Sequence, residues 1–167
     1  QSGSLVTAGT YVALDAGHDV TVTGAPSVTA GTYVEIETGN DVTVSADSMV
    51  TALSEYIEVT ANGNLTVDSS TLDAAGLVNL AANGGDLTLT IATVEAGTSV
   101  TGTAFSDILI QDASVVTAGT NVDLSAGGDL TVDASTIVAT AGFVKLTAEG
   151  DVIVRNTSSI TSSAILR

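Results

Sequence analysis

Carboxylate side chains recur at one place in a repeated pattern, each directly after a small or polar residue. The recurring residues are Asp19, Asp41, Asp86, Asp107, Asp129 and Asp151, and Asn64 takes the corresponding position between Asp41 and Asp86. If equivalent residues stack at the spacing of neighbouring β-strands, about 4.8 Å, two such charges repel by about 1 kcal/mol in water. A divalent cation would relieve this repulsion. The column is therefore a candidate metal site, with calcium as the candidate cofactor.

A second interpretation of the same aspartates needs no metal. Each carboxylate could cap its own turn and point into solvent, where salt screens its charge. The chain also lacks the nine-residue Gly-Gly-x-Gly-x-Asp repeat of calcium-binding solenoids. Glycines and asparagines beside the aspartates are expected to supply the positive φ angle that a tight corner needs. Both interpretations place the aspartates at corners between strands.

Three tyrosines form a candidate interface. Tyr11, Tyr33 and Tyr56 occupy nearly equivalent outward positions in the repeated pattern, so we expect their rings to stack along one edge. Such a stack could bind a sugar or a neighbouring filament, because aromatic residues are enriched at interfaces. It could equally serve to stabilise adjacent strands.

The cationic residues form a second candidate interface. They are Lys145, Arg155 and Arg167, whereas residues 1–144 carry no Lys or Arg. This polarity would favour stacking of the C-terminal end of one copy on the acidic N-terminal end of another. We expect salt to weaken that attraction.

Residues suited to catalysis are few, and their spacing supports no catalytic site. His18 is the single histidine, and the absence of cysteine excludes a disulfide framework, a thiolate zinc site and a cysteine nucleophile. Pairs of carboxylates are expected by chance when 19 acidic residues repeat along one chain. No long loop interrupts the repeat to build a groove around such a pair. We therefore expect no enzyme activity, no catalytic residue and no required cofactor.

The composition indicates that β-strands position these residues. The 167 residues are 44% hydrophobic but only 3% aromatic, and they are rich in Thr and Val, which favours strands over helices. A formal net charge of -16 excludes a protein that binds the nucleic-acid backbone, since such binding needs a basic face. No apolar run approaches the roughly 18 residues of a membrane helix, so we expect no membrane insertion.

A repeat of 22 residues organises the chain. Its marker is a column of aliphatic residues: Val6, Val28, Val50, Leu72, Val94, Val116, Val138 and Ile160. Within each unit apolar and polar residues alternate, as in a strand with one buried face, and we expect three short strands per unit. Repeats three and four slip by one residue in mid-unit and then recover.

Short strands of this kind bury their apolar faces only when equivalent strands of successive units stack in parallel. The sequence therefore predicts an all-β fold, a right-handed parallel β-helix (β-solenoid) of about seven rungs of 22 residues. We expect one domain over residues 1–167, with repeats that start at residues 6, 28, 50, 72, 94, 116 and 138 and a partial rung from residue 160. Gly102 stands where other rungs place Leu or Ile. Rung five should therefore be thinly packed, with Phe105 turned inward to compensate.

Two phrases of the repeat carry a family resemblance. Residues 6–22 read VTAGTYVALDAGHDVTV, and residues 116–132 read VTAGTNVDLSAGGDLTV. This pattern resembles the repeats of filamentous-haemagglutinin-like bacterial adhesins, over essentially all of residues 6–159. The resemblance implies a secreted right-handed β-helix that holds a binding region away from the cell. No catalytic residue carries over from it.

From the repeat and this resemblance we expect an extracellular or cell-surface structural protein. It would be either the shaft of a bacterial surface adhesin or the protomer of a head-to-tail filament in a cell-surface or biofilm matrix. Its expected partners are copies of itself, with host or matrix glycans as further candidates. The alternative is a carbohydrate-binding or carbohydrate-cleaving β-helix, which a groove with side loops and clustered aromatic residues would distinguish.

Overall fold

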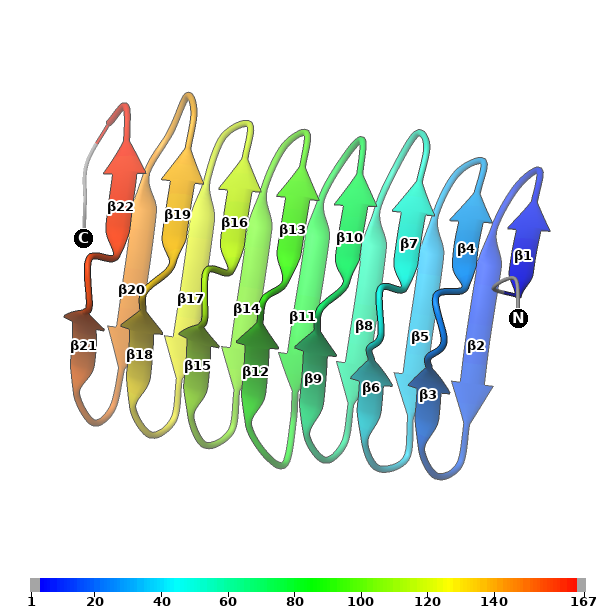
Figure 1. The fold of residues 1–167 in the computed structure, drawn as a ribbon, viewed down its shortest axis with the longest axis horizontal. Coiled ribbons are helices and arrows are strands. Elements are labelled where there is room, and N and C mark those ends of the chain that lie inside the picture. Colours follow the sequence, from blue (N-terminus) through cyan, green and yellow to red (C-terminus); the bar gives the residue numbers. More distant parts are fainter. Residues whose placement is uncertain (1–3, 165–167) are drawn as a thin grey trace.

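Residues 4–164 form a right-handed parallel β-solenoid in the computed structural model, which describes that part of the chain. These residues contain 22 strands and no helix. The chain runs up the front of the molecule, down the back and up the front again while it advances toward the C-terminus (Figure 1). Every third strand therefore stacks in parallel on its predecessor. The predicted all-β solenoid of about seven rungs is confirmed.

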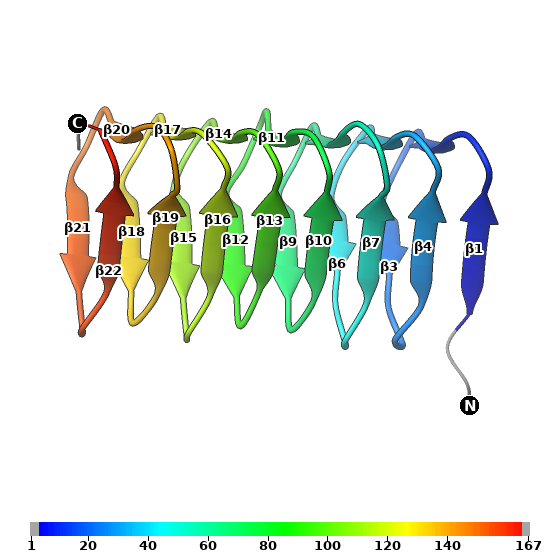
Figure 2. The ribbon, with the colours of Figure 1, turned by 90° about the horizontal axis from the view of Figure 1, so that it is seen from above.

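Three sheets form the sides of the solenoid, and Figure 2 shows them from above, with the long axis of the rod again horizontal. Sheet A consists of β1 (Leu5–Ala8), β4 (Ser27–Ala30), β7 (Met49–Ala52), β10 (Thr71–Ala74), β13 (Thr93–Ala96), β16 (Val115–Ala118), β19 (Thr136–Ala139) and β22 (Ser159–Ser162). Sheet B consists of β2 (Val12–Ala16), β5 (Val34–Thr38), β8 (Ile57–Ala61), β11 (Val78–Ala82), β14 (Val100–Ala104), β17 (Val122–Ala126) and β20 (Val144–Ala148). Sheet C consists of β3 (Val20–Val22), β6 (Val42–Val44), β9 (Leu65–Asp68), β12 (Leu87–Thr90), β15 (Ile108–Gln111), β18 (Leu130–Asp133) and β21 (Val152–Arg155).

A rung is one strand from each sheet in the order A, B, C. Rung one is therefore β1 to β3, rung seven is β19 to β21, and β22 opens an eighth rung. The turns between the sheets are called here the A–B, B–C and C–A corners. All the candidate sites described below lie at these corners or on the outer faces between them.

The interior of the solenoid is a stack of aliphatic side chains from all three sheets. Ile36, Ile57 and Leu65 have no exposed surface, because alternation along each strand sends every second side chain inward. Parallel pairing in register places each inward residue on its equivalent one rung away, as Val34 lies on Ile57. Apolar contacts therefore continue from rung to rung along the rod.

The corners differ in length by one residue, and a longer corner is followed by a shorter one. This compensation explains the slip in repeats three and four. Rung three has one extra residue at its A–B corner, and rung four has one extra residue at its B–C corner. Both rungs then use a C–A corner that is one residue shorter. Val50, Leu72 and Val94 consequently pair in register despite the slip between them.

The same shortening makes one predicted position wrong. The C–A corner before β19 is again short, so Ile137 pairs with Val116 and is buried. Val138 lies opposite Thr117 on the outer side instead. A longer A–B corner restores the column by Ile160, which pairs with Ile137. The sequence prediction failed because Ile137 and Val138 are adjacent aliphatic residues, and a fixed period cannot choose between them.

The C–A corner changes length by changing how many consecutive residues have positive φ. Long corners have two, such as Ala46 and Asp47, both with φ of 58°. Short corners have one, which is Ser69, Ile91 or Ala134. The left-handed region costs a residue with a Cβ atom roughly 1–2 kcal/mol. This corner therefore holds backbone strain in rung after rung.

Buried serines, which the sequence analysis missed, satisfy the polar backbone at the C–A corner. They are Ser48, Ser70, Ser114 and Ser135, and each is at most 5% exposed. The Ser114 hydroxyl donates to the Gln111 carbonyl (2.7 Å) and accepts from the N–H of Ala92 one rung earlier (3.1 Å). Within residues 4–164, no buried side-chain nitrogen or oxygen lacks a hydrogen-bond partner.

Rung five is packed differently from the prediction. Phe105 is 70% exposed, so it does not turn inward. The space beside Gly102 is filled by two leucines: a Cβ atom built on Gly102 would lie 2.7 Å from Cδ2 of Leu124 and 3.2 Å from Cδ2 of Leu87. Neighbouring side chains therefore close the gap, and rung five is not thinly packed at this point.

Candidate functional site

The predicted aspartates stack in one column at the B–C corner and join each rung to the next. The backbone N–H of Asp107 donates to Oδ1 of Asp86 (3.1 Å). The N–H of Asp129 donates to Oδ1 of Asp107 (2.8 Å), and the N–H of Asp151 donates to Oδ1 of Asp129 (2.8 Å). Each carboxylate therefore caps the following rung rather than its own turn. We call this column the corner ladder.

Asparagine serves equally well in the corner ladder, because the bond needs only an acceptor oxygen. The N–H of Asn64 donates to Oδ1 of Asp41 (2.7 Å), and the N–H of Asp86 donates to Oδ1 of Asn64 (3.0 Å). At the first rung, Oδ1 of Asp19 accepts from the N–H of Asp41 (3.2 Å) and from Nδ2 of Asn40 (2.7 Å). Asn64 thus continues the ladder where the sequence suggested an interruption.

Glycines beside the corner ladder provide space rather than the predicted positive φ. Among the described glycines, Gly24 alone has a positive φ (87°), and it lies at a C–A corner. A Cβ atom on Gly63, Gly128 or Gly150 would overlap the Oδ1 atom of the ladder aspartate one rung earlier. The missing side chain is what lets that carboxylate reach the N–H group of the next rung.

Calcium binding by the corner ladder stays a prediction. Within the described range, no group of three or more His, Cys, Asp or Glu side chains lies close enough together to hold a metal ion. Each N–H group that donates to a ladder carboxylate offsets part of the repulsion between neighbouring charges. The geometry therefore gives the aspartates a structural task that needs no cation.

The three tyrosines stack on rungs one to three, as predicted. The ring centroids of Tyr11 and Tyr33 are 5.1 Å apart with planes 6° from parallel, and those of Tyr33 and Tyr56 are 4.8 Å apart at 8°. Rings stacked in this way cover one another's faces, which leaves the edges, the hydroxyls and the outer faces of the two end rings for a partner. Loss of solvent raises the pKa of Tyr56, and the negative charge of Glu35 raises it further.

A shallow hollow opens beside the last ring of the stack. It encloses about 350 Å³ and is lined by Tyr56, Glu58, Leu77, Asn79 and Thr101. Nδ2 of Asn79 donates to Oε1 of Glu58 (2.9 Å), and Oγ1 of Thr101 donates to Oδ1 of Asn79 (2.7 Å). The side chains of Glu58, Asn79 and Thr101 are therefore bonded to one another, and a ligand of these groups would have to compete with these bonds.

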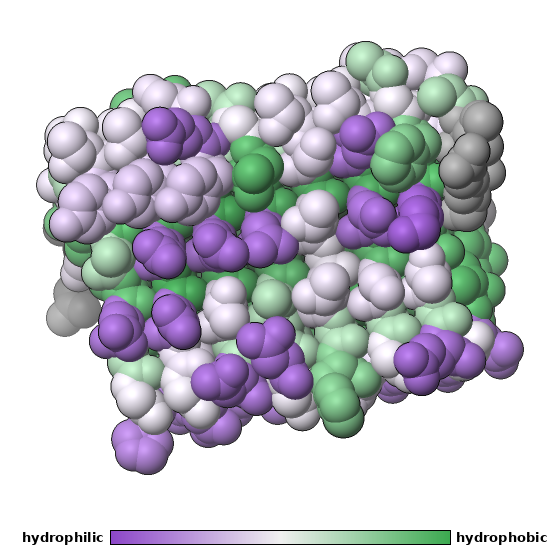
Figure 3. Space-filling view, turned by 180° about the vertical axis from the view of Figure 1, so that it is seen from behind, coloured by the Kyte–Doolittle hydropathy of each residue, from purple (hydrophilic) through white to green (hydrophobic). Residues whose placement is uncertain are grey.

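Charge is distributed unevenly over the outer face of sheet B, where polar side chains form rows across the strands (Figure 3). Near the N-terminal end, Glu35 and Glu58 are direct neighbours in register. Near the C-terminal end, the equivalent neighbours are Asp123 and Lys145, whose charged atoms lie 3.2 Å apart. The acidic row is balanced by a cation only at the C-terminal end.

Two of the three predicted interface cations pair within the chain. Besides Lys145, Arg155 places its Nε atom 2.9 Å from Oδ2 of Asp133. Nδ2 of Asn156 donates to Oδ1 of the same carboxylate (2.6 Å). The hydrogen bond from Asn156, followed by that from Arg155 and its charge, lowers the pKa of Asp133. Arg167 lies outside the described residues, and stacking of a second copy on these cations stays a prediction.

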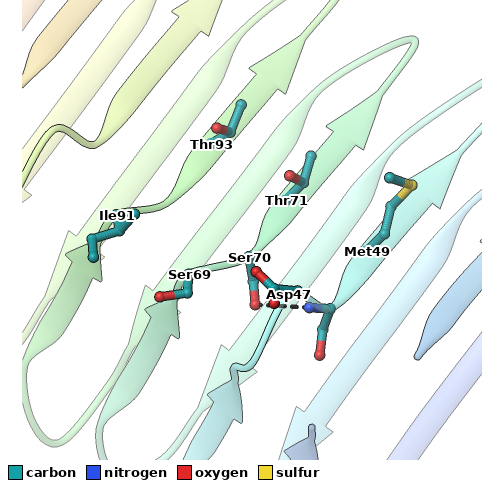
Figure 4. Close-up of a pocket in the computed structure, with 8 residues that line it drawn as sticks. Asp47, Met49, Ser69, Ser70, Thr71, Ile91 and Thr93 are labelled. Atoms are coloured by element: carbon teal, nitrogen blue, oxygen red, sulfur yellow. Dashed lines mark hydrogen bonds between the residues drawn. The ribbon is translucent and has the colours of Figure 1, made fainter. Parts of the chain in front are cut away.

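Another hollow lies at the C–A corner, where rungs three and four both have the short corner (Figure 4). It encloses about 330 Å³ and is lined by Asp47, Ser48, Met49, Ser69, Ser70, Thr71, Ile91 and Thr93. The backbone N–H of Ser48 donates to Oγ of Ser70 (3.2 Å) inside it. The Ser48 and Ser70 hydroxyls donate to backbone carbonyls of the corners, so these two groups serve the fold.

The chain matches none of the protein-family models, curated proteins or solved structures with which it was compared. The likeness to filamentous-haemagglutinin-like adhesins therefore rests on the repeat phrases, and the fold agrees with those phrases as far as the β-solenoid. Residues 4–164 provide no helix with the length and hydropathy to cross a membrane.

Proposed function

We propose that the chain is a structural rod, a segment of the shaft of an extracellular bacterial surface adhesin. The proposal rests on the constancy of the rungs: all three sheets run from rung one to rung seven, and each strand pairs in parallel with its equivalent in the next rung. Such a rod holds whatever is attached to its end at a fixed distance. The repeat phrases supply the link to adhesins. This role requires no catalytic step and no cofactor.

The described rungs at the two ends have a neighbouring rung on one side only, and they expose apolar side chains that inner rungs bury. Leu5 and Val6 of the first rung are 71% and 45% exposed, and Val152 and Val154 of the last are 45% exposed each, although the equivalents of the valines are buried in inner rungs. The end strands also present backbone N–H and C=O groups on an unpaired edge. An added rung would bury these side chains and pair these groups.

A head-to-tail filament of separate copies is the second candidate. In such a filament, the strands of the C-terminal rung of one copy would pair with those of the N-terminal rung of the next copy.

The hollow beside Tyr56 favours a glycan as a partner of the rod over a glycan as a substrate. It combines one aromatic side chain with carboxylate, amide and hydroxyl groups, which suits a sugar. Glycoside cleavage usually needs two carboxyl groups across the scissile bond. Glu58 is the one carboxylate among the residues that line this hollow.

Immunolabelling of the source cells tests the proposed function. An antibody against the folded chain is applied to intact and to permeabilised cells, with a cytoplasmic protein as the control, and the label is located by electron microscopy. We expect label on thin surface rods of intact cells. Label that appears only after permeabilisation would contradict an extracellular shaft.

Sedimentation of the purified chain separates the shaft from the filament. A shaft segment should give short particles of limited size over a wide range of concentration. Growth into particles many times the length of one chain would support the filament form instead. Raising the salt concentration should strengthen such growth if apolar end rungs drive it, and weaken it if the charged ends drive it.

A further inference from the structure

Rung four has a B–C corner unlike that of every other described rung. Between the end of the sheet B strand and the residue of the corner ladder, the other rungs have two residues, such as Asn62–Gly63 in rung three. Rung four has three, which are Asn83, Gly84 and Gly85. Because of the additional residue, the residues of this corner do not align one to one with those of the corner in rung three.

The extra residue removes a hydrogen bond that is present at the B–C corners of rungs three, five, six and seven. In rung three, the N–H of Gly63 donates to the carbonyl of Asn40 (2.8 Å). In rung four, the N–H of Asn83 keeps the bond to Ala61 (2.8 Å), but the N–H of Gly84 has no acceptor anywhere in the described chain. Asn83 and Gly84 are both exposed to solvent.

We propose that Asn83–Gly84 is a site of spontaneous deamidation and that Asn62–Gly63 is a protected copy of the same dipeptide. In this reaction the backbone nitrogen of Gly84 loses its proton to a base and attacks Cγ of Asn83. A new bond from Cγ to that nitrogen forms, the bond from Cγ to the side-chain nitrogen breaks, and the amide group leaves as ammonia.

The succinimide ring that results then adds one water molecule. Attack at one ring carbonyl gives aspartate at position 83, and attack at the other gives isoaspartate, in which the main chain runs through the side-chain carboxyl carbon. The net change is the uptake of water and the loss of ammonia, with no oxidant or cofactor. Either product places a new carboxylate beside the corner ladder.

Hydrogen bonding decides which of the two dipeptides reacts. The glycine nitrogen must leave any hydrogen bond before it can attack, so the bond to Asn40 protects the dipeptide that contains Gly63. Gly84 has no such bond to break. Glycine is also required at that position, since a Cβ atom there would overlap the carbonyl oxygen of Asn62. The packing of the corner therefore requires glycine at position 84, and glycine is also the residue that hinders ring closure least.

Timed mass spectrometry of the intact chain tests this proposal. The chain is held at mildly alkaline pH and physiological temperature, and samples are cut with a protease that cleaves at acidic residues, which separates the two dipeptides. We expect Asn83 to convert about tenfold faster than Asn62, since one backbone hydrogen bond of ordinary strength changes an equilibrium by up to that factor. In denaturant the two rates should become equal. Equal rates in the folded chain would overturn the proposal.

Deletion of Gly84 separates the effect of the hydrogen bond from that of the sequence. The variant keeps an Asn-Gly dipeptide, now Asn83 followed by Gly85, in a two-residue corner like that of rung three. We expect its conversion to slow to the rate of Asn62 in the same molecule. Fast conversion in a folded deletion variant would contradict the proposal. The comparison of folded and denatured wild-type chain stands independently if the variant does not fold.

Discussion

The B–C and C–A corners face the same problem, a turn that leaves backbone N–H and C=O groups without partners in the strand ladders. At the B–C corner, an exposed carboxylate or amide reaches the N–H group of the next rung, and glycine makes room for it. At the C–A corners of rungs two, three, five and six, a buried serine hydroxyl bonds to the backbone of its own corner, and residues with positive φ make the turn.

The two solutions differ in how they accept a change of length. The C–A corner switches between one and two residues with positive φ and keeps its serine bond in both forms, as Ser70 and Ser114 show. The B–C corner has an extra residue only in rung four among the described rungs, and Gly84 then loses its bond. Crowding should therefore dominate mutational effects at the B–C corner, and buried polar groups should dominate them at the C–A corner.

Gly39→Ala should have the largest effect, because it crowds backbone against backbone at the B–C corner. A Cβ atom here would overlap the carbonyl oxygen of Gly17 one rung earlier. We expect the free energy of unfolding to fall by about 3 kcal/mol, the upper end for overpacking. Denaturant unfolding measures this loss. Gly17→Ala, at the same position of rung one with no atom within 4 Å, is the matched control and should stay within about 0.5 kcal/mol of wild type.

Ser114→Ala should have the second largest effect on stability, and it tests the role of the buried serine at the C–A corner. The substitution leaves the N–H of Ala92 and the carbonyl of Gln111 without the hydroxyl that both use. Because Ser114 is completely buried, we expect a loss of about 2 kcal/mol in the free energy of unfolding. Ser125→Ala, on the partly exposed outer face of β17, should change it by less than about 0.5 kcal/mol. Equal losses in the two variants would show that the buried serines do not hold this corner.

Asp107→Ala and Asp107→Asn test whether the corner ladder needs the acceptor oxygen or the negative charge of the aspartate. Alanine removes the acceptor for the N–H of Asp129, and we expect a loss of about 1 kcal/mol in the free energy of unfolding. Asparagine keeps an acceptor oxygen and should be nearly neutral, as the natural Asn64 indicates. Thermal and denaturant unfolding distinguish the two. A loss with Asn as large as that with Ala would mean that the charge matters, which would support a bound cation.

Ile91→Gly should stabilise the C–A corner, a gain that the B–C corner does not offer. Ile91 has a φ of 50° and is 57% exposed, so glycine relieves strain while little buried surface is lost. Relief of the positive φ raises the free energy of unfolding, and the larger conformational entropy of glycine in the unfolded chain lowers it. The difference predicts a net gain of about 0.5 kcal/mol. Leu53→Gly, equally exposed but without positive φ, should lower it instead. Losses in both variants would contradict strain at this corner.

Asp133→Asn should have the smallest effect, and one that depends on pH. Hydrogen bonds from Asn156 and Arg155 lower the pKa of Asp133 in the folded chain. A lowered folded pKa means that the contribution of this carboxylate to stability is present above its unfolded pKa and is lost as the pH falls through the folded pKa. Unfolding measured over the acidic range should therefore show a shallower acid loss in the variant. Parallel curves for variant and wild type would contradict this assignment.

Features that recur in every rung could be predicted from the sequence, because alternation and period act on many residues at once. The strands, the inward columns, the tyrosine stack and the column of corner aspartates belong to this group. The position of Val138 could not be predicted, since it depends on one residue lost at a corner. The outward position of Phe105 could not be predicted either, because Leu87 and Leu124 fill the space beside Gly102 and the sequence pattern does not indicate this packing.

The roles of the corner residues were harder to predict than their positions. The sequence indicates that aspartates and glycines mark the B–C corner, but the bond from one rung to the next appears only when rungs are placed on each other. The buried serines recur at the C–A corner and could have been found as a column. Their burial could not be predicted, because serine is common in exposed turns and its burial at a corner depends on the neighbouring rungs.

Cryo-electron microscopy of the surface structures that an antibody to the chain labels tests the proposal that the chain is a rod of stacked rungs outside the cell. We expect labelled rods of constant width with an axial repeat near 4.8 Å. Labelled particles that are globular and lack this repeat would contradict the proposal.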